Sequence, residues 1–311
     1  MAYLKEGGYV QENELIDFGG LAQVRPDEFL GGALWHLHKA IDAPHKSLLK
    51  LFLMESYAAE YPRIRWLCTQ LKSAVYVGSM DVNELDSYIL MYRKVEQFLS
   101  ERNNLKRFDL VRQSFYLNMN ELLTVRSAVD VEKLHRRQIL EKMVAEWGWE
   151  SHRIQQLDQR SYWQLNQALK EQQSINHELK ESYRTIKRFA LEYAEIDRPV
   201  GEEIKLLGRK LAAALENRPG KVEKINLDHN YRISPEDFSL LEVSLADGKF
   251  GWAIYTGRGN QANAHQEKPL KKSRSLIEIL AWLCLNGLYR RGKRNVRERG
   301  KGSNQIGRAH V

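Results

Sequence analysis

Cysteine is scarce in this sequence. The two that occur, Cys68 and Cys284, lie far apart in patterns typical of helices. Proteins that fold around disulfides in oxidising compartments usually carry more cysteines, so a disulfide between these two is disfavoured. Two isolated cysteines are typical of a reducing compartment, and we expect a cytoplasmic protein.

Long apolar runs are also missing. The longest, residues 276–288, contains Glu278 and Asn286. It is too short to span a bilayer, which needs about 20 apolar residues. The first residues show no signal-peptide pattern. The sequence therefore predicts no membrane span.

Spacings typical of catalytic or metal sites are missing as well. Gly257-Arg-Gly259 is not followed by Lys-Ser/Thr and opens no helix, so it is not a phosphate loop. His36 and His38 lie two residues apart on an expected helix and therefore point in divergent directions. No Ser–His–Asp or Cys–His arrangement can be argued from spacing. We expect neither catalytic residues nor metal ligands in this chain.

Positive charge is plentiful, but it is confined to one end. Residues 290–311 hold eight Lys or Arg and one Glu, a net charge of +7 out of +8 for the whole chain. Residues 1–289 therefore carry a net charge of only +1. A nucleic-acid-binding protein would spread positive charge over its folded body. We expect no nucleic-acid partner.

The basic tail, residues 290–311, has no apolar period, and we expect it to be disordered. Its end, Ile306-Gly-Arg-Ala-His-Val311, resembles the in-frame translation of a common sequencing-library adapter. The tail is therefore interpreted as non-native. The alternative is a natural basic tail.

Hydrophobic periodicity predicts a mainly α protein. Helical patterns cover most of residues 26–196, and we assign residues 1–196 to a multi-helix domain. The composition changes at Asp197-Arg198-Pro199, after which residues 197–289 read as a smaller α/β (α+β) segment. The expected helices are 11–18, 26–61 with a bend, 63–76, 81–99, 108–123, 131–147, 162–193, 201–217 and 273–289. The expected strands are 221–227, 238–245 and 250–255.

The bend within residues 26–61 is the stretch around which the chain is organised. Pro44 restarts the helix there, and Lys39, Lys46 and Lys50 gather around the bend. Gly31 and Gly32 would each cost a helix about 1 kcal/mol relative to Ala. We expect another backbone to pack closely against them.

The same stretch carries a family resemblance. Glu28-Phe-Leu-Gly-Gly-Ala-Leu-Trp-His-Leu-His-Lys39 resembles the E-[YF]-[FL]-G-x-[SA]-L-W-x-L-x-K segment of class I adenylate cyclases, the cytoplasmic enterobacterial type. His38 and His45 stand where that family usually has tyrosine. Further matches run in order over about residues 12–289. They include Arg107-Phe-Asp-Leu-Val-Arg112, Ser182-Tyr-Arg184, Pro219-Gly-Lys-Val222, Gly251-Trp252 and Asn286-Gly287-Leu288.

The resemblance implies a lyase that converts ATP to cyclic AMP and pyrophosphate with Mg²⁺. The family is similar to polymerase-β-like nucleotidyltransferases, in which a Gly-Ser turn precedes a metal-binding Asp-x-Asp pair. No such segment occurs here, because Gly78-Ser79 precedes Asp81 in a helical pattern. We therefore expect a fragment that lacks the N-terminal nucleotidyltransferase region and is inactive alone. The family's C-terminal region, linked to sugar-uptake regulators, is expected to be absent too.

The helical half of such an enzyme would help to close the nucleotide site. Lys39, Lys46 and Lys50 are the candidates for contacts with the triphosphate, and the alternative is that they are solvated lysines on an outer face. Trp35 could lie under the base, but a core position is favoured. Two alternatives for the whole chain stay open: a helical protein-interaction module that docks through residues 162–193, and a nucleotide-binding module without catalysis.

Overall fold

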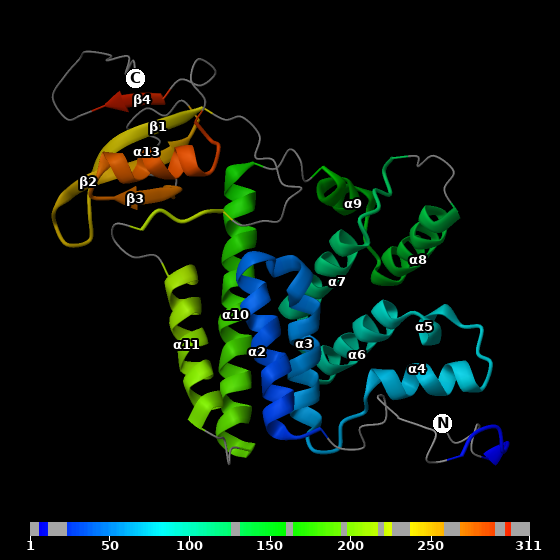
Figure 1. Cartoon of the computed structure of the whole chain (residues 1–311). Coiled ribbons are helices and arrows are strands. Elements are labelled where there is room, and N and C mark those ends of the chain that lie inside the picture. Colours follow the sequence, from blue (N-terminus) through cyan, green and yellow to red (C-terminus); the bar gives the residue numbers. More distant parts are fainter. Residues whose placement is uncertain are drawn as a thin grey trace.

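The computed structural model describes residues 6–11, 24–125, 131–159, 164–193, 198–216, 221–225, 237–257, 268–289 and 296–299. Within these ranges, helices occupy the chain as far as Leu215, and the first strand begins at Phe238 (Figure 1). This arrangement confirms the expected mainly α fold with a smaller α/β segment. In the described part of the chain, no helix is both long enough and apolar enough to cross a membrane.

The helical part contains ten described helices with bounds close to the predicted ones. They are α2 Pro26–Asp42, α3 Pro44–Glu60, α4 Leu67–Tyr76, α5 Val82–Leu85, α6 Ser87–Glu101, α7 Leu105–Met119, α8 Val131–Trp147, α9 Ser151–Asp158, α10 Leu165–Tyr193 and α11 Arg198–Leu215. The short α9 was not predicted. Except for Gln11, the helix predicted over residues 11–18 lies outside the described residues.

The single helix predicted over residues 81–99 is two helices, because two aspartates each cap a start. The Asp81 carboxylate accepts a hydrogen bond from the backbone N–H of Asn83 at 2.9 Å. The Asp86 carboxylate accepts from the N–H groups of Tyr88 at 2.7 Å and Ile89 at 3.0 Å. A side-chain acceptor at this position satisfies N–H groups that a helix start leaves unpaired, so α6 begins afresh at Ser87.

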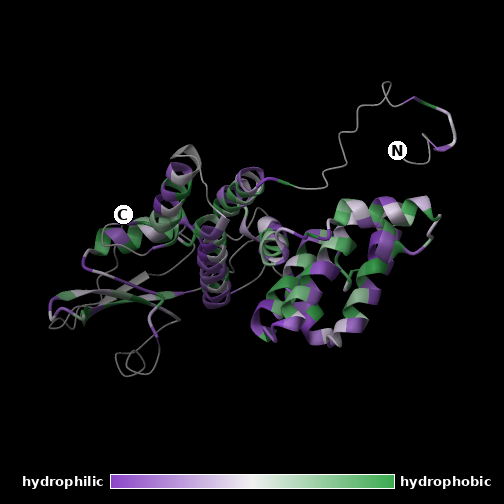
Figure 2. Ribbon diagram, turned by 90° about the horizontal axis from the view of Figure 1, so that it is seen from below, coloured by the Kyte–Doolittle hydropathy of each residue, from purple (hydrophilic) through white to green (hydrophobic). Residues whose placement is uncertain are grey.

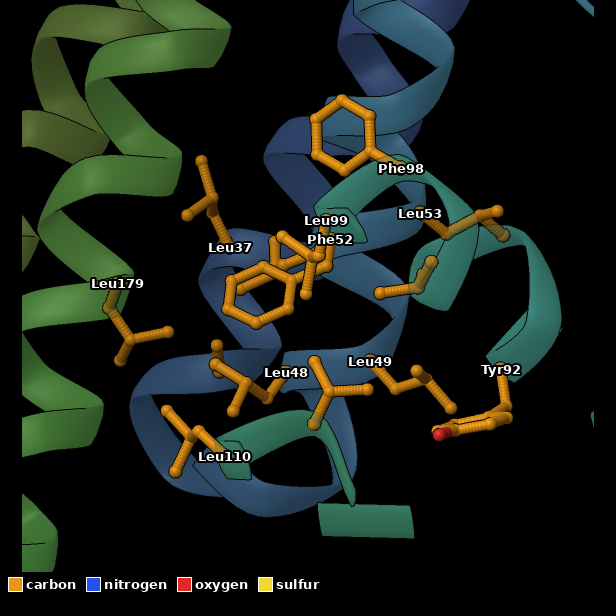
Figure 3. Close-up of a cluster of buried hydrophobic side chains, with 14 of the residues drawn as sticks. Leu37, Leu48, Leu49, Phe52, Leu53, Tyr92, Phe98, Leu99, Leu110 and Leu179 are labelled. Carbon is orange, nitrogen blue, oxygen red and sulfur yellow. The ribbon is translucent and has the colours of Figure 1, made fainter. Parts of the chain in front are cut away.

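The main core lies between α2, α3, α6, α7 and α10. Figure 3 shows side chains from all five helices converging there, among them Leu37, Phe52 and Leu99, which are fully buried. Burying one such side chain stabilises a fold by about 1.5–3 kcal/mol. In Figure 2, hydrophilic and hydrophobic residues alternate along the helices, which is typical of helices that bury one face.

The longest helix, α10, joins this core to a second one. Its first residue, Leu165, is buried in the cluster of the sheet, with Phe238 and Trp282. From Ile175 onward its buried side chains belong to the helical core. Figure 1 shows the sheet lying at the end of α10 where the helix begins. Because α10 buries apolar side chains in both cores, it connects the helical part of the chain to the sheet.

The sheet is built from β1 Phe238–Ser244, β2 Phe250–Thr256, β3 Lys271–Ser273 and β4 Val296–Arg299, in the order β3-β2-β1-β4. The predicted hairpin is confirmed, since β1 and β2 are antiparallel with Leu241 opposite Ala253. The following helix, α13 Leu276–Leu285, packs on β2 and β3. The three-residue β3 was not predicted, because two lysines and a serine give no apolar signal.

Strand β4 corrects the expectation of a wholly disordered tail. It lies within residues 290–311 and pairs in parallel with β1, with Phe238 opposite Val296. Backbone pairing needs no apolar period, so charge and composition alone did not reveal this strand.

The strand predicted over residues 221–227 is also corrected. Residues 221–225 are described and form no strand. The side chain of Asn286 forms the backbone hydrogen bonds that a neighbouring strand would otherwise form. Its amide oxygen accepts from the N–H of Ile225 at 2.7 Å, and its amide nitrogen donates to the carbonyl of Glu223 at 3.1 Å.

Helix α11 packs with the helical part of the chain. Its side chains Ile204, Leu207 and Leu211 are buried in the same core as α2 and α10. The sheet residues form separate clusters. The domain boundary at residues 196/197 stays a prediction.

Candidate functional site

The site begins with the bend between α2 and α3. Only Ala43 separates the two helices, and its N–H donates to the carbonyl of Lys39 at 3.0 Å. Pro44 takes the first position of α3, where its missing N–H leaves no bond unmade. This short connection places the end of α2 beside the start of α3. Lys39, Lys46 and Lys50 are all exposed around it.

Trp35 does not occupy the expected core position. Its side chain is 58% exposed, and the Lys39 ammonium lies 4.9 Å from the centre of the indole ring. The prediction failed because Trp35 falls on the outer face of α2, while Leu34 and Leu37 on either side of it are buried. A cation over an exposed indole contributes about 0.5–1 kcal/mol.

His36 lies within the electrostatic reach of both Lys39 and Lys50. Burial lowers the pKa of this half-buried imidazole below 6.5, and the positive charges of Lys50 and Lys39 lower it further. The two ammonium groups, from different helices, therefore act on one ring. Lys46 lies one turn before Lys50 and joins the group through helical spacing alone. Sequence reasoning missed His36, although its spacing of three from Lys39 was a usable signal.

The glycines of α2 do not meet another backbone. A Cβ built on Gly31 or on Gly32 would have nothing within 4 Å, and both residues are exposed. The expectation of a close backbone contact is therefore wrong for the described chain. The glycines therefore leave part of the outer face of α2 without side chains, next to Trp35.

We call Trp35, His36, Lys39 and Lys50 the bend surface. An exposed indole can stack on a planar ring, and ammonium groups form short charge-assisted hydrogen bonds to phosphate oxygens. The arrangement can hold a ligand with an aromatic base at one end and an anionic group at the other. It offers no nucleophile.

A buried ion network fixes the helices that carry this surface. Arg107 on α7 donates two hydrogen bonds to the carboxylate of Glu55 on α3, at 2.7 and 2.8 Å. Its Nε donates to Glu178 on α10 at 2.6 Å, and Ser182 donates to Glu55 at 2.6 Å. Burial alone would lower the pKa of Arg107, but the two glutamates outweigh it and raise the pKa above its usual value.

Arg107 therefore has a structural role, and two other charged residues of α7 belong to different ion pairs. Asp109 accepts from Arg153 at 3.0 Å, and Arg112 lies 3.7 Å from Glu96. The same α7 face thus supplies separate ion pairs to neighbouring helices.

Metal ligation is not supported in the described part of the chain, where no three His, Cys, Asp or Glu side chains gather in a group that could hold an ion. Asp81, which follows Gly78-Ser79, is used as a helix cap, and Ser79 donates to Glu84 at 2.6 Å. Gly259, the last residue of the Gly257-Arg-Gly259 stretch, lies outside the described residues.

Trp147 is 7% exposed, and its ring centre lies 4.7 Å from that of Trp149 with the two planes tilted by 57°, so this pair is part of the core. Cys68 and Cys284 are both free thiols, as the sequence predicts.

Comparison with protein families gives two matches in order along the chain. Residues 24–226 match the family model described as adenylate cyclase, class-I, second domain. Residues 233–304 match the model described as adenylate cyclase, class-I, third domain. The second match reaches 15 residues into the segment that was interpreted as non-native, from residue 290 to residue 304, which corrects that interpretation for this part.

Curated relatives agree with the family models. The chain is 34% identical over 283 residues to proteins named adenylate cyclase from Salmonella typhimurium and Escherichia coli K12. A Proteus mirabilis protein of the same name is 32% identical over 282 residues. These matches cover 90% of this chain but only 33% of each relative, so the chain spans about a third of their length. No solved structure matches the chain.

Proposed function

Since this chain belongs to the class-I adenylate cyclase family, we propose that it forms part of a lyase that converts ATP into 3′,5′-cyclic AMP and pyrophosphate. Its share of the work is to hold the nucleotide. The carboxylates and the Mg²⁺ that such chemistry requires belong to a region outside the chain. The protein works in the cytoplasm, and sugar-uptake regulators act through a region that is likewise outside it.

The observation that carries the proposal is the Trp35 indole, 58% exposed, with the Lys39 ammonium 4.9 Å from its ring centre. The positive charge of Lys50, from α3, acts on the neighbouring residue His36. The adenine would stack on Trp35, and the triphosphate would take Lys39, Lys46 and Lys50 as donors. A hydrogen bond to a charged group contributes about 1.5–3 kcal/mol, and stacking of a base on an aromatic ring about 1–3 kcal/mol.

The described residues do not fit the metal. No cluster of three ligand side chains occurs among them, and the bend surface itself offers cations rather than carboxylates. No reaction step is therefore assigned to Mg²⁺ here. What these residues can do is neutralise the triphosphate and orient the nucleotide, which lowers the barrier through positioning and electrostatics.

The alternative of a protein-interaction module that docks through residues 162–193 has less support. Helix α10 buries Leu165 in the sheet cluster and Ile175, Leu179 and Ile186 in the helical core. Its apolar seam is thus used within the chain. A nucleotide-binding module without catalysis would use the same bend surface, and an activity assay separates it from the cyclase.

The experiment is a titration of the purified chain with ATP, in which binding is measured by isothermal calorimetry and by tryptophan fluorescence. Lys39→Ala and Lys50→Ala should each weaken binding about five-fold in the isolated chain, since exposed ion contacts contribute about 1 kcal/mol. Trp35→Phe should remove the fluorescence change. Lys187→Ala is the matched control, an exposed lysine on α10, and should leave binding unchanged.

The larger test uses the enzyme joined to its nucleotidyltransferase region. There the same lysine variants should lower kcat/KM for ATP about ten- to hundred-fold, because a closed site excludes water and strengthens each contact. Near-parental kinetics for Lys39→Ala, Lys46→Ala and Lys50→Ala would show that they are solvated lysines on an outer face.

A further inference from the structure

A cleft of about 570 Å³ lies at the outer edge of the sheet. It is lined by Lys221 and Glu223, by β3 with the three residues before it, and by Arg274 and Glu278. Its volume is within the range of sites for small molecules. None of the bend-surface residues lines it, so it is a separate feature of the chain.

The lining is strongly basic. Five cationic side chains face two carboxylates around the cleft. The cations are Lys221, Lys268, Lys271, Lys272 and Arg274. Such an excess within one concave site focuses positive potential and attracts anions.

The two carboxylates of the lining are already engaged. Both oxygens of Glu223 accept from the Lys271 ammonium at 2.7 Å. Glu278 accepts from the hydroxyl of Ser273. Arg274 pairs with Asp247, which is not part of the lining. These contacts fix the walls of the cleft and neutralise Lys271, but they do not engage Lys268 or Lys272.

Lys268 and Lys272 are the cations left over. Both are exposed, and no ion pair joins either to a carboxylate within the described ranges. Lys221 is held by the carbonyls of Ala214 and Glu216, each at 2.9 Å. Lys268 and Lys272 are therefore the two lining lysines for which a ligand would supply the partner.

Strand β3 adds backbone donors. It is the edge strand of the sheet, paired with β2 on one side and with no strand of the described chain on the other. The outward N–H groups of an edge strand are available for hydrogen bonds. Ammonium groups beside such an edge strand match an oxyanion with several acceptor oxygens.

We propose that this cleft binds a small anion that carries phosphate groups. Its volume exceeds what a single phosphate fills, so the ligand is of the size of pyrophosphate or of a phosphorylated small molecule. The site is independent of the nucleotide site proposed at the bend surface, and neither needs the other.

The test titrates pyrophosphate into the full chain at low salt, with calorimetry and amide NMR as readouts. Shifts should be confined to residues 221–223 and 268–278, and binding should weaken steeply as salt is added. The double variant Lys268→Gln/Lys272→Gln should weaken binding at least ten-fold. Both side chains are exposed, so the variant should keep the parental melting temperature.

Lys249→Gln is the matched control, an exposed lysine in the β1–β2 turn outside the lining. It should bind pyrophosphate as the parent does. Equal loss in the control and the double variant would mean attraction to net charge alone and would overturn the proposal. So would shifts that map to the bend surface, or no binding by the parent chain. Lys39→Ala should leave this titration unchanged, which separates it from the nucleotide test.

Discussion

Arg107 on α7 donates two hydrogen bonds to the carboxylate of Glu55 on α3, and Glu55 is only 3% exposed. Removing Arg107 would leave a buried carboxylate without its countercharge. We expect Arg107→Ala to lower the free energy of unfolding by about 3–5 kcal/mol in a urea titration. Arg184→Ala breaks an exposed pair with Glu181 and should cost under about 1 kcal/mol. Equal losses would show that the buried pair contributes no more than a surface one.

The pKa of His36 offers a second prediction. Burial, Lys50 and Lys39 hold it below 6.5, so the folded chain favours the neutral ring. The unfolded chain then binds more protons at acidic pH, and the free energy of unfolding should fall as pH drops below about 6.5. Lys39→Ala or Lys50→Ala should raise the pKa in an NMR titration.

Tripolyphosphate should also raise the pKa of His36, because a bound anion offsets the nearby positive charges. Lys187→Ala serves as the control and should leave the titration as it is in the parent. If the pKa of His36 is the same in both lysine variants as in the parent, the two ammonium groups do not act on the ring.

Gly31 and Gly32 give a third prediction with two readouts. Each lies inside α2 with open space where a Cβ would be. Gly31→Ala and Gly32→Ala should therefore each stabilise the isolated chain by about 1 kcal/mol. If the nucleotidyltransferase region packs on this face, the same variants should lower cyclase activity in the joined enzyme. Destabilisation of the isolated chain would contradict the open surface.

Strand β4 makes truncation informative. Ending the chain after Tyr289 removes the parallel partner of β1 and should lower the thermal stability of the sheet. Ending it after Arg299 keeps β4 and should leave the melting temperature within error of the parent. Equal behaviour of the two truncations would mean that the pairing of β4 adds no stability.

The last prediction is that the isolated chain makes no cyclic AMP from ATP with Mg²⁺ or Mn²⁺. In the described residues there is no group of three side chains that could hold a metal ion, and lysines cannot replace metal-bound carboxylates. Adding the nucleotidyltransferase region should restore activity. Turnover above background by the chain alone would reveal a catalytic site that these residues do not explain.

The sequence by itself determined the class of the fold and most of its elements. Periodicity predicted α8 at its observed bounds, Val131–Trp147, and the pairing of β1 with β2. Such elements are specified locally, by the spacing of apolar side chains and by turn residues. The resemblance around Glu28–Lys39 likewise identified the family, because the order of residues along the chain survives without knowledge of contacts.

Only the tertiary structure decided which faces stay open and which charges meet. Trp35 has a large aromatic side chain of the kind that usually packs in a core, yet it lies on the outer face of α2 with Lys39 beside it. The charge of Lys50 on α3 acts on His36 of α2, and β4 pairs with β1, which lies more than fifty residues earlier in the chain. These relationships depend on packing between segments distant in sequence, and no local pattern encodes the angle at which two helices or strands meet.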